Sequence, residues 1–251
     1  MHPRILAVTT ARILRQLRHD RRTVALLTVV PALLLTVLYF MYENQPVAPG
    51  QPRTFDRVAL IMLGLFPFVV MFLVTSVAML RERTSGTLER LLTTPMGRLD
   101  LLFGYGIAFG LTAAVQAAIA TGVAYWLLDL HTAGSPGLVV MIAVANAVLG
   151  VALGLFCSAF ARTEFQAVQF MPVVVIPQSL LCGLFVPRHE MADWLQAVSD
   201  VLPLTYAVEA LQEVGRYGEP TGTMWRDTAV VAGAVVVSLL LAATTLRRRT
   251  P

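Results

Sequence analysis

The chain has 251 residues, of which 57% are hydrophobic and only 14% are charged, and its mean hydropathy is +0.71. Soluble domains typically contain about 45–50% apolar and about 25% charged residues, so this composition excludes an ordinary water-soluble fold. The formal net charge is +4, and all 19 basic side chains other than histidine are arginine, because the sequence contains no lysine.

The apolar residues gather into six long stretches with few or no charges. A helix needs about 20 apolar residues to cross a hydrocarbon core of roughly 30 Å, and each stretch can supply that number. Helices are the structures that satisfy the backbone of such separate segments inside a bilayer. The sequence therefore predicts an all-α integral membrane protein. We expect its six transmembrane helices at about residues 23–42, 58–80, 101–128, 137–161, 166–187 and 228–246.

The segment before the first span, residues 1–22, has the pattern of an amphipathic helix. Its apolar and basic residues fall on opposite sides: Leu6, Ile13, Leu14 and Leu17 against Arg15, Arg18 and Arg22. We expect this helix to lie in the inner membrane interface, with its basic side toward lipid phosphates. The alternative is that the arginines only anchor the topology. The first span is too long for a signal sequence and lacks a small-x-small cleavage site, so we interpret it as a retained span.

Arginine placement predicts the orientation. Fourteen arginines lie before the first span, in residues 81–100, at residue 162, or in the tail at 247–251. The five on the other side are Arg53, Arg57, Arg188, Arg216 and Arg226. Because positively charged loops stay in the cytoplasm, both termini and residues 81–100 are expected there. No basic patch is interleaved with aromatic residues, so we expect no nucleic-acid partner.

Residues 81–100 form a charged loop between two apolar runs. Gly86-Thr87 can start a short helix, with Glu89 in a first turn that the helix dipole favours, and Pro95 would end it. The apolar stripe of this helix consists of Leu88, Leu91 and Leu92. Charge on one side and leucines on the other suit docking against a soluble protein. The alternative is a solvated loop that merely connects two spans.

Polar residues and prolines interrupt the predicted spans. Six are candidates for lining a translocation path, because polar groups in a bilayer tend to face protein or a water-filled cavity. They are Gln116, Asn146, Gln169, Pro172, Pro177 and Gln178. The prolines should kink the fifth span, and the uncharged amides could equally bond neighbouring helices. The Gly-x-x-x-Gly pairs at 106–110 and 150–154 allow close helix approach, which we expect within one subunit.

The segment between the last two spans, residues 188–226, lies on the outer side by the charge argument. Apolar residues recur there at helical spacing before and after Pro203. They predict two short amphipathic helices that end near Gly215. Neither is long enough to span, so both should rest on, or dip into, the outer leaflet.

No motif in the chain carries catalytic chemistry. A chain without lysine cannot contain a Gly-x-x-x-x-Gly-Lys phosphate loop. His189-Glu190 is followed by Asp193 where a zinc peptidase would have its second histidine. Cys157 and Cys182 lie inside predicted spans and offer no metal-ligand spacing. We therefore expect no enzymatic activity, metal or cofactor in this chain itself.

Two stretches resemble the type-2 ATP-binding-cassette (ABC) permeases. The first is RERTSGTLERLL at residues 81–92, followed by Thr94-Pro95 and Arg98. The second is LCGLFVP at residues 181–187, then Trp194 and LPLTYA at residues 202–207. Six spans, inner termini and the missing ATPase motif agree with this family, so the resemblance covers nearly the whole chain. It is strongest to small bacterial permease subunits of daunorubicin-type drug exporters.

The resemblance implies roles for both stretches. In that family the loop between spans two and three carries a coupling helix that sits on the ATPase subunit. This assigns the contact to Arg83, Gly86, Thr87, Leu88, Glu89, Arg90, Leu91 and Leu92. Short re-entrant outer helices precede the last span, and their motif would be Trp194, Pro203, Leu204, Thr205, Tyr206 and Glu209.

The resemblance also implies partners and a location. A separate ABC ATPase subunit would bind ATP and Mg, and a second permease copy would form a homodimer or a paralogous heterodimer. The complex would lie in the lipid of a bacterial cytoplasmic membrane. The leading hypothesis is export of an amphiphilic drug, antibiotic or lipid. The alternatives are export of polysaccharide, glycan or sodium, and a non-transporting module that tethers or senses through a partner ATPase.

Overall fold

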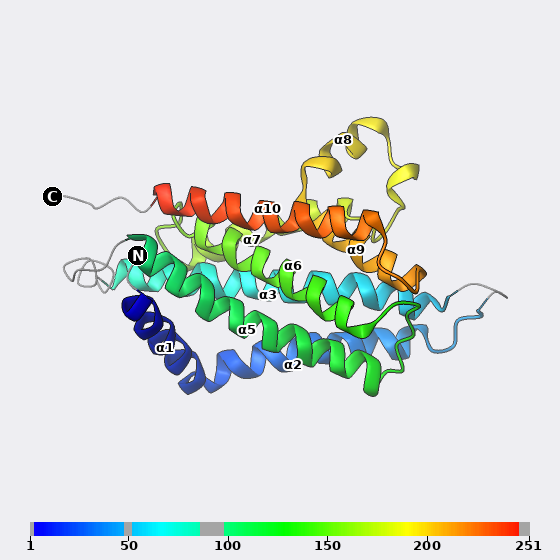
Figure 1. Ribbon diagram of the computed structural model, residues 1–251, viewed down its shortest axis with the longest axis horizontal. Helices are drawn as coiled ribbons and strands as arrows, with labels where there is room; N and C mark the ends of the chain where they lie inside the picture. Colours follow the sequence, from blue (N-terminus) through cyan, green and yellow to red (C-terminus); the bar gives the residue numbers. More distant parts are fainter. Residues whose placement is uncertain (1–2, 48–51, 86–97, 246–251) are drawn as a thin grey trace.

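The computed structural model describes residues 3–47, 52–85 and 98–245 (Figure 1). In these ranges every regular element is helical, which confirms the predicted all-α fold. In chain order the elements are α1 (Pro3–His19), α2 (Arg21–Tyr42), α3 (Thr54–Thr84), α5 (Arg98–Trp126), α6 (Pro136–Cys157), α7 (Glu164–Leu181), the 3₁₀ turn η1 (Arg188–Glu190), α8 (Asp193–Val201), α9 (Pro203–Arg216) and α10 (Gly222–Thr245).

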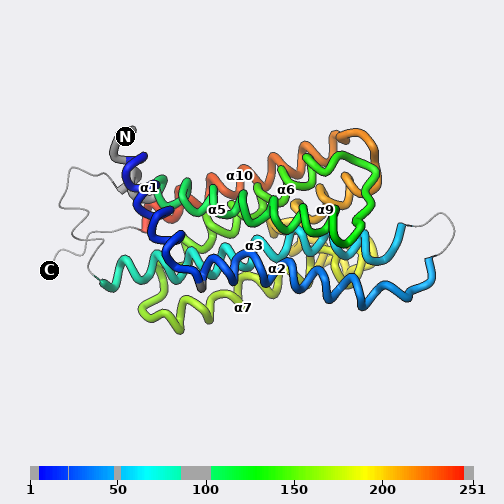
Figure 2. Tube along the Cα trace, turned by 90° about the horizontal axis from the view of Figure 1, so that it is seen from below, coloured from blue at the N-terminus to red at the C-terminus, as the bar shows by residue number. Residues whose placement is uncertain are grey.

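The long helices α2, α3, α5, α6, α7 and α10 run roughly side by side in an elongated bundle (Figures 1 and 2). α1 slants across one end of the bundle, where α3, α6 and α10 finish and α5 and α7 begin. α8 and α9 lie at the opposite end, with the loops at residues 43–47 and 127–135 (Figure 1). We call these the α1 end and the α8 end.

Five of the described helices are long and apolar enough to cross a membrane: Thr23–Tyr42, Thr54–Thr84, Phe103–Trp126, Pro136–Cys157 and Gly222–Thr245. The predicted count of six is not confirmed, because α7 does not meet the same criterion. α7 has 18 residues, or about 27 Å of helix, and it contains a glutamate, three glutamines and two prolines. It nevertheless packs along α3, starting at the α1 end of the bundle (Figure 2).

Helix α3 is the centre of the bundle, and most of its apolar side chains are buried against α6, α7 and α9. Its closest neighbour is α6, because two glycines bring the backbones together. A Cβ at Gly150 would lie 2.3 Å from the carbonyl oxygen of Phe68, and one at Gly154 would lie 2.6 Å from that of Phe72. This pair packs within one chain, as expected. A Cβ added at Gly106 or Gly110 would meet no atom of another helix closer than 3.7 Å.

The helices at the α1 end have limits that differ from those of the predicted spans and loops. The first helix stops at His19, because Asp20 caps the next helix by accepting a hydrogen bond from the backbone nitrogen of Thr23. Arg22 therefore belongs to α2. The second span continues four residues past Leu80 to Thr84, and α5 already begins at Arg98. Residues 81–84 and 98–100 are thus helical ends rather than parts of a loop.

The two short helices predicted between the last two spans are present. Leu202 separates α8 from α9, and Pro203 occupies the first turn of α9, where the missing N–H costs nothing. α9 ends at Arg216, one residue after the predicted end at Gly215. α9 buries an apolar face against α3 and α10, whereas α8 projects from the bundle (Figure 1).

Candidate functional site

The last turn of α3 is fixed by polar contacts to two other helices at the α1 end. The Arg81 guanidinium binds both carboxylate oxygens of Glu164, the first residue of α7, at 2.8 and 2.9 Å. Arg83 donates to the carbonyl oxygen of Ser158, directly after α6, at 2.9 Å. These contacts hold the point at which the chain leaves α3 toward residue 86.

Glu82 points to the opposite side of α3 and is nearly buried. Arg12 of α1 donates to its Oε1 at 3.4 Å and to the hydroxyl of Tyr105 of α5 at 3.1 Å. Three consecutive residues, 81 to 83, therefore connect α3 to α7, α1 and the end of α6. Sequence reasoning carried over Arg83 by family motif alone and did not foresee these partners.

The predicted coupling residues lie mostly outside the described part of the chain. Arg83 is described, and it contacts the end of α6 as given above. The rest of the set falls in residues 86–97, outside the described residues: Gly86, Thr87, Leu88, Glu89, Arg90, Leu91 and Leu92. Their role remains a prediction, and the described structure next to them is the last turn of α3.

Two of the predicted path residues are buried amides in the middle of the bundle. Asn146 of α6 donates from Nδ2 to the carbonyl oxygen of Gly64 in α3 at 2.8 Å. Gln116 of α5 is buried, and neither of its amide atoms has a hydrogen-bond partner among the described residues. Asn146 thus bonds two helices, whereas Gln116 is a polar group without a described partner in the interior.

The other four path candidates lie on α7 and face in different directions. Gln169, Pro172 and Pro177 are exposed. Gln178 is buried, donates to the carbonyl oxygen of Val174 at 2.9 Å and accepts from the backbone nitrogen of Leu204 at 3.4 Å. It satisfies an N–H of the first turn of α9, which has no partner within that helix. The six candidates are therefore not brought together in one place.

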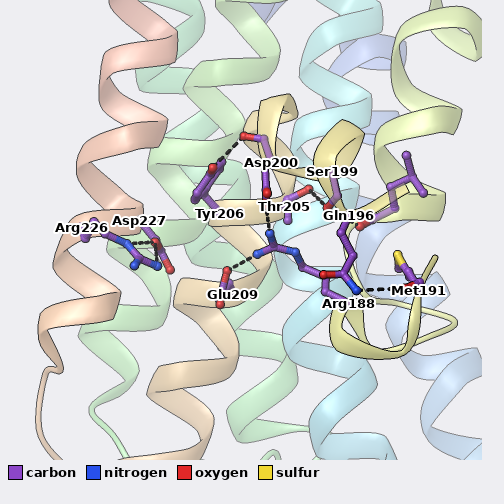
Figure 3. Close-up of polar contacts among 11 residues, drawn as sticks. Arg188, Met191, Gln196, Ser199, Asp200, Thr205, Tyr206, Glu209, Arg226 and Asp227 are labelled. Carbon is purple, nitrogen blue, oxygen red and sulfur yellow. Dashed lines mark hydrogen bonds and ion pairs between the residues drawn. The ribbon is translucent and has the colours of Figure 1, made fainter. Parts of the chain in front are cut away.

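The outer motif is organised around Arg188, which follows α7 (Figure 3). Its guanidinium binds Asp200 of α8 and, at 2.6 Å, Glu209 of α9. The Tyr206 hydroxyl donates to the backbone carbonyl of Asp200 at 2.7 Å. The end of α8 is thereby tied to α9 and to the loop after α7.

A second set of contacts lies beneath α8. Ser199 donates to the carbonyl oxygen of Leu181 at 2.9 Å, and its hydroxyl lies 3.2 Å from that of Thr205 (Figure 3). Leu204 and Thr205 are fully buried. Of the motif residues, Trp194 is the one that points away from the protein, with 69% of its surface exposed.

An acidic residue missed by the sequence analysis lies beside this motif. Asp227 is fully buried, and Arg226 binds its Oδ1 at 2.8 Å (Figure 3). The predicted last span began at residue 228, whereas α10 begins at Gly222. Both charges therefore lie inside a helix long enough to span a membrane. The signal available in the sequence was the arginine-aspartate pair immediately before the apolar run.

The α8 end has a further ion pair at the start of α3. Arg53 binds the buried carboxylate of Asp56 at 3.1 and 3.2 Å, and Asp56 also accepts from the backbone nitrogen of His131 at 3.2 Å. The hydrogen bond to Asp56 raises the pKa of Arg53 above its usual value. These contacts tie the start of α3 to the loop between α5 and α6.

Charge is distributed unequally between the two ends. Of the acidic residues whose side chains are described, three lie at the α1 end: Asp20, Glu82 and Glu164. The other ten lie at the α8 end: Glu43, Asp56, Asp129, Glu190, Asp193, Asp200, Glu209, Glu213, Glu219 and Asp227. Arginines are distributed the other way, with more of them at the α1 end, and the prediction of topology was based on this difference. The α1 end is therefore the more positive end.

The fold and these contacts define a class. Apolar side chains are exposed along α2 and α10, where a soluble protein would present polar ones; examples are Leu26, Leu33, Val236 and Leu240. Five apolar helices, a charge difference between the two ends and no cluster of metal ligands among the described residues characterise a multi-pass helical membrane protein.

Comparison with known families makes the assignment specific. Residues 3–214 match the family model described as ABC-2 type transporter, so the chain belongs to that family. Of the two stretches that carried the resemblance, the second lies wholly within the described residues. The first is described at residues 81–85 and at Arg98.

Individual relatives agree with this family. The chain is 27% identical over 153 residues to the probable multidrug ABC transporter permease YbhR of Escherichia coli K12, which covers 61% of this chain and 42% of the relative. It is 27% identical over 135 residues to the linearmycin resistance permease protein LnrN of Bacillus subtilis, covering 54% and 35%. The Dictyostelium discoideum ABC transporter G family member 20 is 27% identical over 198 residues, covering 78% and 27%. The chain thus spans less than half of each of these relatives.

Proposed function

We propose that the chain is the permease subunit of an ATP-driven exporter that moves an amphiphilic drug, antibiotic or lipid out of a bacterial cell. The family supports the transporter class, and the printed names of two relatives, a multidrug permease and a linearmycin resistance permease, support this type of cargo. ATP and Mg would bind a separate ATPase subunit, and two permease copies would work together.

The observation that carries the coupling part of this proposal is the fixed last turn of α3. Residues 81–83 are connected to α1, α6 and α7, so force applied to the segment that follows would reach four helices. This turn lies at the positive α1 end, which the positive-inside rule favours as the cytoplasmic end. An ATPase docked on residues 86–92 would act there.

The same proposal makes α7 the fifth of six spans. Its first residue is held at the α1 end by Arg81, and its last turn reaches the α8 end, where Gln178 bonds the start of α9. Its exposed polar side, with Gln169, would face the second permease copy or the translocation path rather than lipid.

Transport in inside-out membrane vesicles tests the proposed function. The chain is co-expressed with the ATPase subunit that copurifies with it, and uptake of a fluorescent amphiphilic dye is followed after ATP addition. We expect uptake that stops when the phosphate-loop lysine of the ATPase is replaced. A complex that forms and hydrolyses ATP without moving any amphiphile would contradict export and favour the tethering or sensing alternative.

A further inference from the structure

A cavity of about 490 Å³ lies at the α1 end, between α1, the start of α2, α3 and α5. This volume falls within the range of roughly 300–1,000 Å³ found for small-molecule sites. Its apolar wall comes from α3 and α5 and includes Leu73, Val77, Ala78 and Phe109. Its polar part includes Arg12, Glu82 and Tyr105. A space with one apolar wall and a few polar groups at one side suits an amphiphilic ligand.

The polar group that selects the ligand is Glu82. Its Oε1 accepts the hydrogen bond from Arg12, and the Tyr105 hydroxyl also interacts with this carboxylate, but the buried Oε2 accepts no hydrogen bond of normal geometry among the described residues. A buried carboxylate oxygen without a donor is costly, and a ligand that supplies a charged donor removes this cost. The missing partner of Glu82 is therefore a hydrogen-bond donor.

The second guanidinium of the lining is already engaged, which leaves the donor to be supplied by a ligand. Arg81 also lines the cavity, but its guanidinium is bound by both oxygens of Glu164. The charged residues that line the cavity are two carboxylates (Asp20 and Glu82) and two guanidinium groups (Arg12 and Arg81). The aromatic rings of Tyr105 and Phe109 on the same wall attract cations through their faces.

We propose that this cavity binds an amphiphilic amine. The ammonium group donates to Oε2 of Glu82, and the apolar body lies against Leu73, Val77 and Phe109. This inference rests on the proposed function, because it treats amines as a class of transported substrate. Such substrates would enter the cavity from the cytoplasmic end. Binding itself requires neither ATP nor the ATPase, so it can be measured separately.

Fluorescence titration of the purified full chain, in nanodiscs of uncharged phosphatidylcholine, tests the proposal. The probe is a dodecyl chain with a dansyl group at one end and a primary ammonium at the other. Two matched probes end in a hydroxyl or a carboxylate. We expect the ammonium probe to bind at least tenfold more tightly than either. Glu82→Gln should remove that preference and leave the affinity for the hydroxyl probe unchanged within twofold.

Two further variants complete the design. Glu219→Gln removes an exposed carboxylate at the opposite, α8 end of the bundle, and the ammonium preference should remain. Ala78→Phe places a ring in the cavity and should abolish binding of both the ammonium and hydroxyl probes. This variant tests whether the probes bind in the cavity even if Glu82→Gln does not fold. Equal binding of the three probes, tighter binding of the carboxylate, or binding unaffected by Ala78→Phe would overturn the proposal.

The outcome is separable from that of the proposed function. A chain that binds amines through Glu82 but supports no ATP-dependent uptake would contradict export and leave the binding site standing. If the Ala78→Phe variant exports amphiphiles as well as the parent chain, and the parent chain shows no preference for amines, the proposed binding site is contradicted while the proposed export function stands.

Discussion

Gly150 of α6 lies so close to α3 that a Cβ there would come within 2.3 Å of the Phe68 carbonyl oxygen. The obstructing atom belongs to the backbone, so the two helices must separate to admit it. We expect Gly150→Ala to destabilise the protein by about 1–3 kcal/mol, as overpacking does, although alanine is intrinsically the better helix former by roughly 1 kcal/mol. The thermal unfolding midpoint of the detergent-purified protein measures this.

Gly110→Ala is the matched control for this prediction. The nearest atom to a Cβ at Gly110 is in the side chain of Val148, 3.7 Å away, which is an ordinary contact. This variant should unfold at the same temperature as the parent chain or higher. Equal losses in both variants would mean that the close approach of α3 and α6 is not what the glycine at position 150 provides.

Single polar residues show how far sequence reasoning reaches at this scale. Asn146 could be predicted to turn away from lipid, but its partner, the carbonyl oxygen of Gly64, is 82 residues away and depends on the register of α3 against α6. Gln169 and Gln178 share one helix, yet one is exposed and the other bonds α9. Local sequence could not distinguish them, because α7 has no clear apolar periodicity.

At the scale of elements, α8 depends on few contacts. Its end is held by Arg188 through Asp200 and by Ser199 through Leu181, while its remaining surface is largely exposed. We expect Arg188→Gln to release α8 while α9 stays protected, because α9 is buried against α3 and α10. A partly exposed ion pair contributes about 1 kcal/mol or less, so backbone hydrogen exchange in α8 should accelerate by up to roughly fivefold.

Arg216→Gln provides the comparison for α8. Arg216 is also at the α8 end, but its described contact is to Gln212 within α9, at 3.5 Å. Exchange in α8 should be unchanged in this variant. If Arg188→Gln accelerates α8 and α9 alike, the arginine stabilises the whole outer segment and not α8 in particular.

The exposed face of α8 should lie in the outer membrane interface. Trp194, Val198 and Val201 are all exposed on one side of the helix, and tryptophan is enriched at membrane–water interfaces. Cysteines at Trp194 and Val198 should react slowly with a membrane-impermeant thiol reagent in intact cells, whereas Glu190→Cys should react quickly. Cysteines at Leu195 and Leu202 should also react slowly. They do not test contact with the membrane, however, because the protein itself half-buries these positions.

Detergent-solubilised protein serves as the control for this labelling. Removing the bilayer should make Val198→Cys as reactive as Glu190→Cys, while Leu195→Cys stays slower. The native thiols Cys157 and Cys182 are buried and should contribute little background. Fast labelling of Val198→Cys in cells would show that α8 projects into water.

The limits of a helix could be predicted from the sequence where a proline or glycine marks them. The break between α8 and α9 and the end of α9 were predicted to within one residue, because Pro203 and Gly215 mark them in the sequence. The ends of the long helices were not, since charged residues continue α3 to Thr84 and begin α10 at Gly222. Charge marks where a chain leaves hydrocarbon, whereas a helix ends where its backbone loses hydrogen-bond partners.

At the scale of the whole molecule, the bundle places the base of residues 86–97 and the cavity beside Glu82 at the same end. We predict that residues 86–92 form the contact with the ATPase, with Leu88 and Leu91 packing into a groove and Glu89 or Arg90 pairing at its rim. Truncating a buried apolar anchor typically costs about 2 kcal/mol or more, whereas a rim charge costs much less. Leu88→Ala with Leu91→Ala should therefore release the ATPase or uncouple export.

Two variants sharpen this last prediction. Thr93→Ala should be nearly silent, because it lies outside the apolar stripe. Leu91→Pro should be more damaging than alanine, since proline breaks a helix while α3 and α5 remain anchored by Arg81, Arg83 and Tyr105. The measurements are copurification of the ATPase and export in cells, at equal membrane levels of each variant. If the double alanine variant and Leu91→Pro both export normally, residues 86–92 only connect α3 to α5, and the ATPase must act on another part of the α1 end.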